Sequence, residues 1–383
     1  MKVVKGADRY VVGKVERFDQ KNHVLSRPLW DPSILDLGRK FFLETVMPRD
    51  KPGYMLQDLS FLNAAWHLET HFARGVRGGQ EGLYAWDWEG EVYTLPRVEP
   101  GLRITVDGPA KVTRDLKRVA KSFGASLVGV CELDRRWLYS YGFYPLRDEH
   151  IEKIEILEDY KYAIAIAIEM DYKGISYSPA HPASATAGLG YSKMAFIAGL
   201  LAQYIRGLGY KAIPCGNDTA CSIPIAIDAG LGELARNGLL ITPEFGPRVR
   251  LCKIFTDLPL VPDRPIEFGV WDFCMRCERC AEECPSQAIM RGAPTEKPNN
   301  ISNREGILKW PINAEKCFAF WIGNHADCAN CIRVCPFNKV PGWLHSAVRW
   351  GVENTRWLDS TFVKLDELFG YGKQHNANDF WNS

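Results

Sequence analysis

The sequence predicts an α+β protein in which an α/β sandwich core precedes a small cysteine-rich module. Three observations carry this prediction. Helical and strand-like segments alternate over residues 109–268, as they do where helices cover a sheet. Hydrophobic residues make up 46% of the 383-residue chain, which is enough to bury a sizeable core. Eight of the twelve cysteines fall between Cys274 and Cys335, after a proline-rich stretch from Pro259 to Pro265.

Shifts in composition divide the chain into four regions. We expect an aromatic-rich N-terminal cap region over 1–108, the core over 109–268, the cysteine module over 269–340, and a C-terminal tail over 341–383 that packs on the core. The formal net charge is +1, with Lys+Arg 47 against Asp+Glu 46. This balance argues against a nucleic-acid-binding protein, which favours a basic excess. The longest apolar runs are far shorter than the roughly 20 residues that span a bilayer, so we expect no membrane span.

The expected elements of the core follow from hydrophobic periodicity and turn residues. Lys161 to Glu169 is the clearest strand, because it is apolar on both faces, like a strand in the middle of a covered sheet. Ala185 to Leu208 predicts a long helix closed by Gly209. The other expected helices are Lys111 to Phe123, Ile223 to Ala229 and Leu234 to Arg236, with Leu56 to Arg74 in the cap region, and the other expected strands are Ser126 to Cys131, Tyr210 to Pro214, Gly238 to Thr242 and Val249 to Phe255.

Two cysteine runs carry the most specific signal in the chain. The first reads Cys-x2-Cys-x2-Cys-x3-Cys-Pro and matches the run of bacterial two-cluster ferredoxins, whose fourth cysteine binds the neighbouring cluster. The second has the same ending but a ten-residue insert after its first cysteine. The spacing therefore predicts a ferredoxin-like module with two 4Fe-4S clusters. We assign Cys274, Cys277, Cys280 and Cys335 to the first cluster, and Cys317, Cys328, Cys331 and Cys284 to the second.

Zinc and disulfides are the alternative explanations for these cysteines. A zinc site is a closed set of four ligands, often two Cys-x2-Cys pairs, and does not account for two Cys-x3-Cys-Pro endings. Disulfide frameworks suit small secreted domains without a core, which this chain is not. The four remaining cysteines, Cys131, Cys215, Cys221 and Cys252, are expected to be buried small hydrophobic residues.

No dinucleotide fingerprint is evident in the core; Gly230 to Ala235 only approximates one. The segments AGLGYSKMAFIAGLLAQYIRGLGYKAIPCGND and SIPIAIDAGLGELARNGLLITPEFGPRVRL, followed by the two cysteine runs, resemble corrinoid-dependent reductive dehalogenases of the respiratory type, over about residues 109–340. The resemblance implies a nitroreductase-like core that holds a base-off cobalamin, with one cluster adjacent to it.

The resemblance also implies roles for individual residues. Tyr191 matches the proton donor of the family, Asn217 matches an asparagine at the halide region, and Arg250 matches the arginine beside the tyrosine. Trp321 matches an aromatic residue that shapes the substrate pocket. The backbone that would cradle the corrinoid is matched by Gly230, Gly232, Gly238 and Thr242.

The chemistry fits these residue types. Replacing a carbon–halogen bond by a carbon–hydrogen bond needs two electrons and one proton and releases a halide. The clusters can pass the electrons singly, and an arginine beside a tyrosine favours the phenolate form and so assists proton donation. Each residue also has a plainer interpretation: Tyr191 as a core tyrosine, Arg250 as a structural ion-pair partner, and Asn217 as a turn residue. The implied substrate is a small organohalide, a chlorinated alkane or alkene.

Two other functions compete with this one. Epoxyqueuosine reductase resembles the chain in cluster spacing and corrinoid core but acts on tRNA. The low net charge and a tyrosine in place of its carboxylate count against it. A non-catalytic electron carrier would not need the core. The family implies a small integral membrane anchor protein and a membrane-side electron donor as partners. It also implies export by a twin-arginine leader to the outer face of the cytoplasmic membrane. No leader is visible here, so we expect either that it was cleaved or that the protein is cytoplasmic.

Overall fold

A four-stranded antiparallel sheet forms the centre of the computed structural model, which describes residues 4–73, 82–86, 99, 101–145, 151–340 and 342–382. The strands lie in the order β1 (Leu127–Glu132), β4 (Tyr162–Glu169), β8 (Val249–Thr256) and β5 (Ala212–Cys215). In β4 every residue from Ala163 to Ile168 is buried. The strand predicted to be covered on both faces is therefore confirmed as an inner strand of the sheet.

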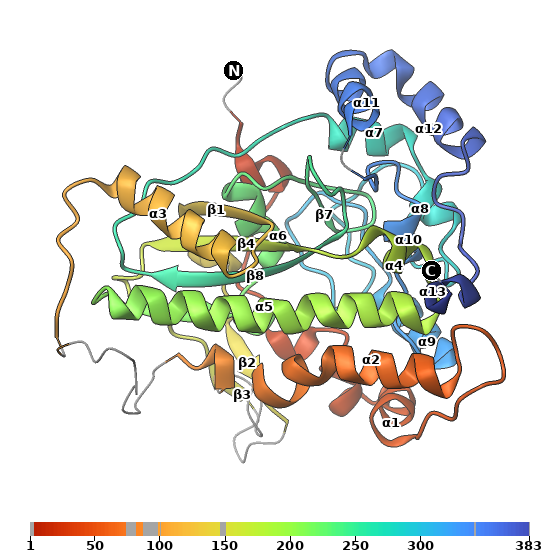
Figure 1. Ribbon diagram of the computed structural model, residues 1–383, viewed down its shortest axis with the longest axis horizontal. Coiled ribbons are helices and arrows are strands. Elements are labelled where there is room, and N and C mark those ends of the chain that lie inside the picture. The colour runs from red at the N-terminus through yellow and green to blue at the C-terminus, as the bar shows by residue number, and fades with distance from the viewer. Residues whose placement is uncertain are drawn as a thin grey trace.

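Helices cover both faces of this sheet (Figure 1). On one face, α3 (Pro109–Ser122) and α5 (His181–Gly207) pack their apolar residues against β4 and β8. On the other face, α6 (Ser222–Asp228) packs against the side chains of alternate strand residues. The predicted helix from Ala185 begins earlier, at His181, because Pro182 occupies the first turn, where proline is tolerated.

Helix α5 has the length and hydropathy of a membrane-spanning segment, contrary to our expectation that no stretch has them. Most of that stretch, 72%, is buried inside the protein. Neighbouring helix α2 (Leu56–Leu68) runs alongside it (Figure 1). The apolar surface of α5 is therefore explained by core packing.

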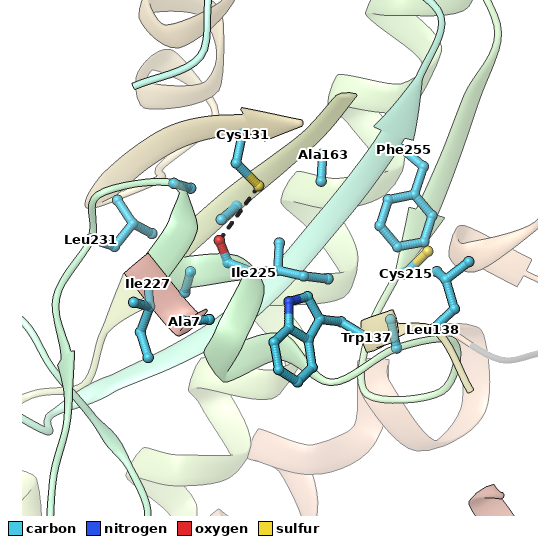
Figure 2. Close-up of a cluster of buried hydrophobic side chains, with 14 of the residues drawn as sticks. Ala7, Cys131, Trp137, Leu138, Ala163, Cys215, Ile225, Ile227, Leu231 and Phe255 are labelled. Atoms are coloured by element: carbon cyan, nitrogen blue, oxygen red, sulfur yellow. Dashed lines mark hydrogen bonds between the residues drawn. The ribbon is translucent and has the colours of Figure 1, made fainter. Parts of the chain in front are cut away.

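Burial in the core explains three of the four cysteines outside the runs. Cys131 and Cys215 lie among apolar side chains on the α6 face of the sheet, where the Cys131 thiol contacts the carbonyl oxygen of Ile225 at 3.6 Å (Figure 2). Cys252 is buried on the opposite face, whereas Cys221 is only partly buried. Burial raises the pKa of Cys215 to about 12, so this thiol remains protonated and acts as a small hydrophobic residue.

One expected element is wrong. The segment Leu234 to Arg236 is not helical: β6 (Glu233–Leu234) pairs with β7 (Leu240–Ile241) as a short hairpin. A Cβ on Gly232 would lie 2.0 Å from the carbonyl oxygen of Ile241, so only glycine permits this approach of the two backbones. The buried Glu233 carboxylate accepts hydrogen bonds from the backbone of Phe268 and Val270, which fixes the hairpin against the start of the cysteine module.

A buried arginine joins the core to the end of the cysteine module. Arg248 is fully buried and forms an ion pair with Glu169 at the end of β4. It also donates hydrogen bonds to the Oδ1 of Asn338, at 3.0 Å, and to the carbonyl oxygen of Lys339, at 3.3 Å. Arg248 therefore adds a second connection between the core and the cysteine module, besides that of Glu233.

The remaining elements lie around this frame. The predicted helix from Leu56 ends at Leu68 and continues as a π-helical turn over Glu69–Ala73; Arg74 lies outside the described residues. The other described α-helices and strands are α1 (Leu35–Leu43), β2 (Tyr141–Phe143), β3 (Ile151–Lys153), α4 (Tyr172–Ser176), α7 (Val270–Arg276), α8 (Arg279–Glu282), α9 (Ala314–Asn324), α10 (Asn330–Arg333), α11 (Trp343–Asn354), α12 (Asp359–Leu368) and α13 (Asn378–Trp381). The C-terminal α12 contacts α7 through the ion pair of Arg276 with Asp359 at 2.9 Å.

Candidate active site and metal centres

Tyr191 and Asn217 meet between α5 and the loop that follows β5. The Asn217 amide nitrogen donates a hydrogen bond to the Tyr191 hydroxyl oxygen at 3.3 Å. Ser222, the first residue of α6, donates to the amide oxygen of Asn217 at 3.3 Å, which sets the orientation of the amide. The Lys253 ammonium in turn donates to Ser222 Oγ, at 3.2 Å, and to the carbonyl oxygen of Gly216. The side chain of Asn217 is thus held with its donor toward the tyrosine.

Arg250 and Trp66 contact the ring of Tyr191. The guanidinium carbon of Arg250, on β8, lies 4.8 Å from the ring centroid, within the range of a cation–π interaction. Trp66 of α2 stacks on the same ring at a centroid distance of 4.7 Å and an interplanar angle of 25°. A Cβ on Gly190 would lie 2.9 Å from Arg250 Cγ, so the glycine makes room for the arginine. Tyr191, Asn217 and Arg250 therefore form one local group, as the resemblance implied.

Several buried polar atoms of Arg250 and of the ten-residue insert have no hydrogen-bond partner in the described part of the chain. They include the Nε of Arg250, the Nε1 of Trp321 and the Oδ1 of Asp327. Buried polar groups are normally paired, so these atoms fit a site that receives a polar bound group such as a corrinoid. Burial raises the pKa of Asp327 to about 7, against the opposing effect of the Arg250 charge. Trp321 lies on α9 inside the ten-residue insert, but no ring contact or hydrogen bond recorded for the described residues joins it to Tyr191.

Two neighbours of this group were missed by the sequence analysis. Trp66 lies in a helix that we identified only by its apolar periodicity. Asp327 directly precedes a predicted cluster ligand, Cys328, and that adjacency was the only signal in the sequence that could have pointed to it. Because the Arg250 charge acts on Asp327, this adjacency also brings Cys328 of the second set near Arg250.

The four residues nominated for a backbone cradle have local structural roles. Gly230, with φ at +74°, lines a groove of about 750 Å³ between α3, the start of β1 and Pro243, and none of Tyr191, Asn217 and Arg250 lines that groove. Gly232 and Gly238 belong to the β6–β7 hairpin, and Thr242 Oγ1 donates to the carbonyl oxygen of Gly246 at 3.2 Å. Their role toward a corrinoid stays a prediction.

The first set of four cysteines lines a single cavity. Cys274, Cys277, Cys280 and Cys335 surround it together with Arg236 and Asn237 of the β6–β7 hairpin. Burial raises the pKa of Cys274 to about 12 and that of Cys277 to about 11. Thiolates bind iron, so loading this site with a cluster must release protons.

The second set gathers around Cys331. The thiols of Cys328, Cys317 and Cys284 all lie close enough to Cys331 to raise its pKa electrostatically, after the larger effect of burial. The sulfur of Cys284 accepts a backbone hydrogen bond from Ala288 at 3.3 Å, and such bonds lower its pKa. Cys335 of the first set also contributes to the raised pKa of Cys331, so the eight thiols lie near one another. Their division into two ligand sets stays a prediction.

The thiols of the two sets are not gathered as the ligands of a single ion are. Within the described part of the chain, no three His, Cys, Asp or Glu side chains converge closely enough to hold one metal ion. A 4Fe-4S cubane is larger than an ion and keeps its four thiolates farther apart.

Comparisons with known proteins agree with this arrangement. A family model described as "4Fe-4S dicluster domain" matches residues 273–339. Tetrachloroethene reductive dehalogenase of Sulfurospirillum multivorans is 37% identical over 328 residues, which are 77% of this chain and 65% of that protein. The chain thus spans less than two thirds of that relative's length. Epoxyqueuosine reductase of Bacillus subtilis is 34% identical over 119 residues, only 30% of this chain and 28% of that protein.

A solved structure shares the fold. A reductive dehalogenase whose structure "suggests a mechanism for B12-dependent dehalogenation" superposes with a TM-score of 0.71 at 22% identity, covering 96% of this chain and 48% of that one. The predicted α+β fold with its dicluster module is thereby confirmed.

Proposed function

The chain belongs to the reductive dehalogenase family, and on that premise we propose that it replaces a carbon–halogen bond of a small organohalide by a carbon–hydrogen bond. The reaction consumes two electrons and one proton. The carbon–halogen bond breaks, a carbon–hydrogen bond forms, and the halogen leaves as a halide ion. The contact that carries the proposal is the hydrogen bond from Asn217 to Tyr191, beside the charge of Arg250.

This contact suits a tyrosine that gives up its proton. Because Asn217 donates to the hydroxyl oxygen, the O–H hydrogen of Tyr191 is directed elsewhere and is available to the substrate. Once the proton has left, the phenolate oxygen keeps the amide as a hydrogen-bond donor, and the Arg250 cation stabilises the negative ring. Asn217 and Arg250 therefore favour the product of proton transfer more than the starting phenol, which is the condition for catalysis.

A cobalamin bound in base-off form would supply a cobalt centre that takes up electrons and cleaves the carbon–halogen bond. We propose that Arg250, Trp321 and Asp327 face it, since each presents an unpartnered buried polar atom. Backbone contacts from Gly230, Gly232, Gly238 and Thr242 are part of the same proposal.

Two 4Fe-4S clusters would deliver the electrons one at a time. We propose the ligand sets given above, with the second set as the one beside the active site because Cys328 follows Asp327. A chlorinated alkane or alkene is the proposed substrate, a choice that the similarity to a tetrachloroethene reductive dehalogenase supports. A small integral membrane anchor protein, a membrane-side electron donor and a location at the outer face of the cytoplasmic membrane are further proposals that rest on the family.

The decisive experiment compares wild-type protein with Tyr191→Phe. Both are loaded with iron, sulfide and cobalamin, and chloride release is measured anaerobically with reduced viologen on a panel of chlorinated ethenes and ethanes. We expect release by the wild type and at least a hundredfold lower rate for the variant. An equal rate in the variant would exclude Tyr191 as the proton donor.

Epoxyqueuosine reductase activity has less support, because its match covers only 30% of the chain. Incubation of the same preparation with epoxyqueuosine-modified tRNA separates the two functions. Turnover of the tRNA without any halide release from the panel would favour the alternative.

A further inference from the structure

Arg236 is a buried cation at the first cysteine set. It lies in the turn between β6 and β7, and its side chain is 0% exposed. The cavity that Cys274, Cys277, Cys280 and Cys335 surround is lined by Arg236 as well. The β6–β7 hairpin therefore places the buried guanidinium of Arg236 beside four predicted cluster ligands.

The hydrogen bonds of Arg236 go to the backbone that holds these ligands. Its Nε donates to the carbonyl oxygens of Cys274, at 3.1 Å, and Cys277, at 3.0 Å, and its Nη2 donates to that of Cys274 at 2.6 Å. The Nη1 donates to Met290 and Gly292, both at 2.9 Å. All of these acceptors are neutral, so they satisfy the donors of the guanidinium without cancelling its charge.

Among the described residues, one ion pair compensates that charge in part. The carboxylate of Glu278 forms this ion pair, with its oxygen 3.5 Å from the guanidinium. The Glu278 side chain is 28% exposed, and its carboxylate also accepts a hydrogen bond from the backbone nitrogen of Gly292. The guanidinium also lies 4.7 Å from the centroid of the Trp310 ring. By contrast, the neighbouring cations Arg279 and Lys339 share a short ion pair each with Asp366, at 2.6 Å. Burying an incompletely paired charge is costly unless an anion accompanies it.

A 4Fe-4S cluster with four thiolates is such an anion, and it gains one more negative charge on reduction. We infer that Arg236 raises the reduction potential of the first cluster by stabilising its reduced form. Net charge and hydrogen bonding around a cluster are established determinants of its potential. Arg236 is thus a tuning residue, not a catalytic one, and the inference rests on the proposed cluster assignment.

The same turn reaches the second set through neutral contacts. Asn237 Nδ2 donates to the carbonyl oxygen of Cys331 at 3.2 Å. Among the described residues, the hydrogen bonds of Arg236 go to Cys274, Cys277, Met290 and Gly292, and none goes to the second set. Arg236 therefore acts on one cluster, and the effect of removing it is expected on one of two midpoints.

The test is a redox titration of the iron–sulfur-loaded full chain, followed by electron paramagnetic resonance. In Arg236→Gln we expect one of the two midpoints to fall by a tenfold change in its reduction equilibrium, which is 59 mV for one electron. Arg236→Lys keeps the charge and should leave both midpoints near those of the wild type. Arg206→Gln is the matched control, because Arg206 likewise donates to backbone carbonyl oxygens, of Ala85, Trp86 and Ala212, but lies at the far end of α5 (Figure 1).

The outcomes separate this inference from the proposed function. Two unchanged midpoints in Arg236→Gln would overturn the inference and leave the clusters and the dehalogenase proposal intact. A Gln variant that retains only one cluster would make Arg236 a structural clamp and would also overturn it. Should that variant fail to fold, Arg236→Lys decides, because a midpoint that falls although the charge is kept contradicts the electrostatic account. Wild-type protein that binds no cluster at all would instead refute the proposed function.

Discussion

The Asn217 amide nitrogen lies 3.3 Å from the hydroxyl oxygen of Tyr191 and donates a hydrogen bond to it, while the amide oxygen accepts one from Ser222. The direction of this one bond decides what the tyrosine can do. A donor to the phenol oxygen helps the proton to leave, whereas an acceptor would retain it. The predictions for the active site follow from this asymmetry.

Replacing Asn217 by alanine removes the donor and should lower kcat by about tenfold to a hundredfold, with a smaller change in KM, since the interaction strengthens as the phenolate forms. Steady-state chloride release measures both constants. Ser222→Ala is the graded control: it frees the amide to rotate but keeps the donor, so its loss should be smaller. A Ser222→Ala loss equal to that of Asn217→Ala would contradict the assigned direction.

Arg250→Gln should lower kcat by roughly a hundredfold, because a neutral side chain no longer stabilises the phenolate or the buried site around it. Arg250→Lys should recover part of the rate, as it keeps the charge without the planar group. The comparison uses the rate of halide release at saturating substrate. If glutamine and lysine gave the same rate, the charge of Arg250 would not matter to the reaction.

Cys335→Ser should damage the first cluster, although this residue ends the second cysteine run. Cys284→Ser should likewise damage the second cluster. Iron and sulfide analysis with electron paramagnetic resonance would show which signal is lost in each variant. Cys252→Ala is the control, since this thiol is buried in the core and its loss should leave the iron content unchanged. Loss of the signals in the opposite order would show that each run binds a cluster by itself.

Enlarging the pocket by Trp321→Ala should shift the preference among chlorinated substrates toward larger ones. Removing the indole leaves space on α9 and also removes its unpartnered Nε1. Trp321→Phe retains an aromatic ring and should keep the wild-type order of preference. Relative kcat/KM values across the halocarbon panel test this, and an unchanged order in the alanine variant would place Trp321 outside the pocket.

Asp228 gives the fold a pH dependence of its own. Burial raises the pKa of this carboxyl from 3.8 to about 6, although it accepts a hydrogen bond from the backbone nitrogen of Ala7 at 2.7 Å. The folded chain therefore holds the proton more tightly than the unfolded chain. Below about pH 4 the carboxyl is protonated in both states and does not lower the free energy of unfolding. Between about pH 4 and pH 6 only the unfolded chain loses the proton readily, so the free energy of unfolding falls as the pH rises.

Asp228→Asn should remove that dependence while keeping an acceptor for Ala7. We expect the variant to gain about 2–3 kcal/mol on wild type between pH 4 and pH 7. Thermal unfolding of both proteins across this range measures the change in the difference between them. A difference that stays constant with pH would show that the carboxyl titrates at its ordinary value.

Local signals sufficed for much of the fold. The continuous apolar run in β4 identified an inner strand, and the cysteine spacing identified the 4Fe-4S dicluster domain over 273–339. The prediction of a helix over Leu234 to Arg236 was wrong because the conformation of this segment depends on contacts outside it. Gly232 packs against the backbone of Ile241, and Glu233 accepts a hydrogen bond from Phe268. No pattern of neighbouring residues encodes such contacts.

The site divides in the same way. Tyr191, Asn217 and Arg250 were found through matched motifs, and the structure places them together. Trp66, Asp327 and Arg236 reach their positions only through packing between elements far apart in the chain. The charges of Asp327 and Arg236 are buried and only partly paired. The spacing of residues along a sequence does not show burial or charge pairing.

The ties that Arg248 makes to Glu169 and Asn338 have a consequence for electron flow. They fasten the cysteine module to the sheet, so on the proposed electron path the distance between cluster and active site is fixed once the chain has folded and needs no domain movement. The rate of that internal hop should then be indifferent to added glycerol or sucrose, and any slowing of turnover in a viscous solvent would have to arise from the encounter with the external donor.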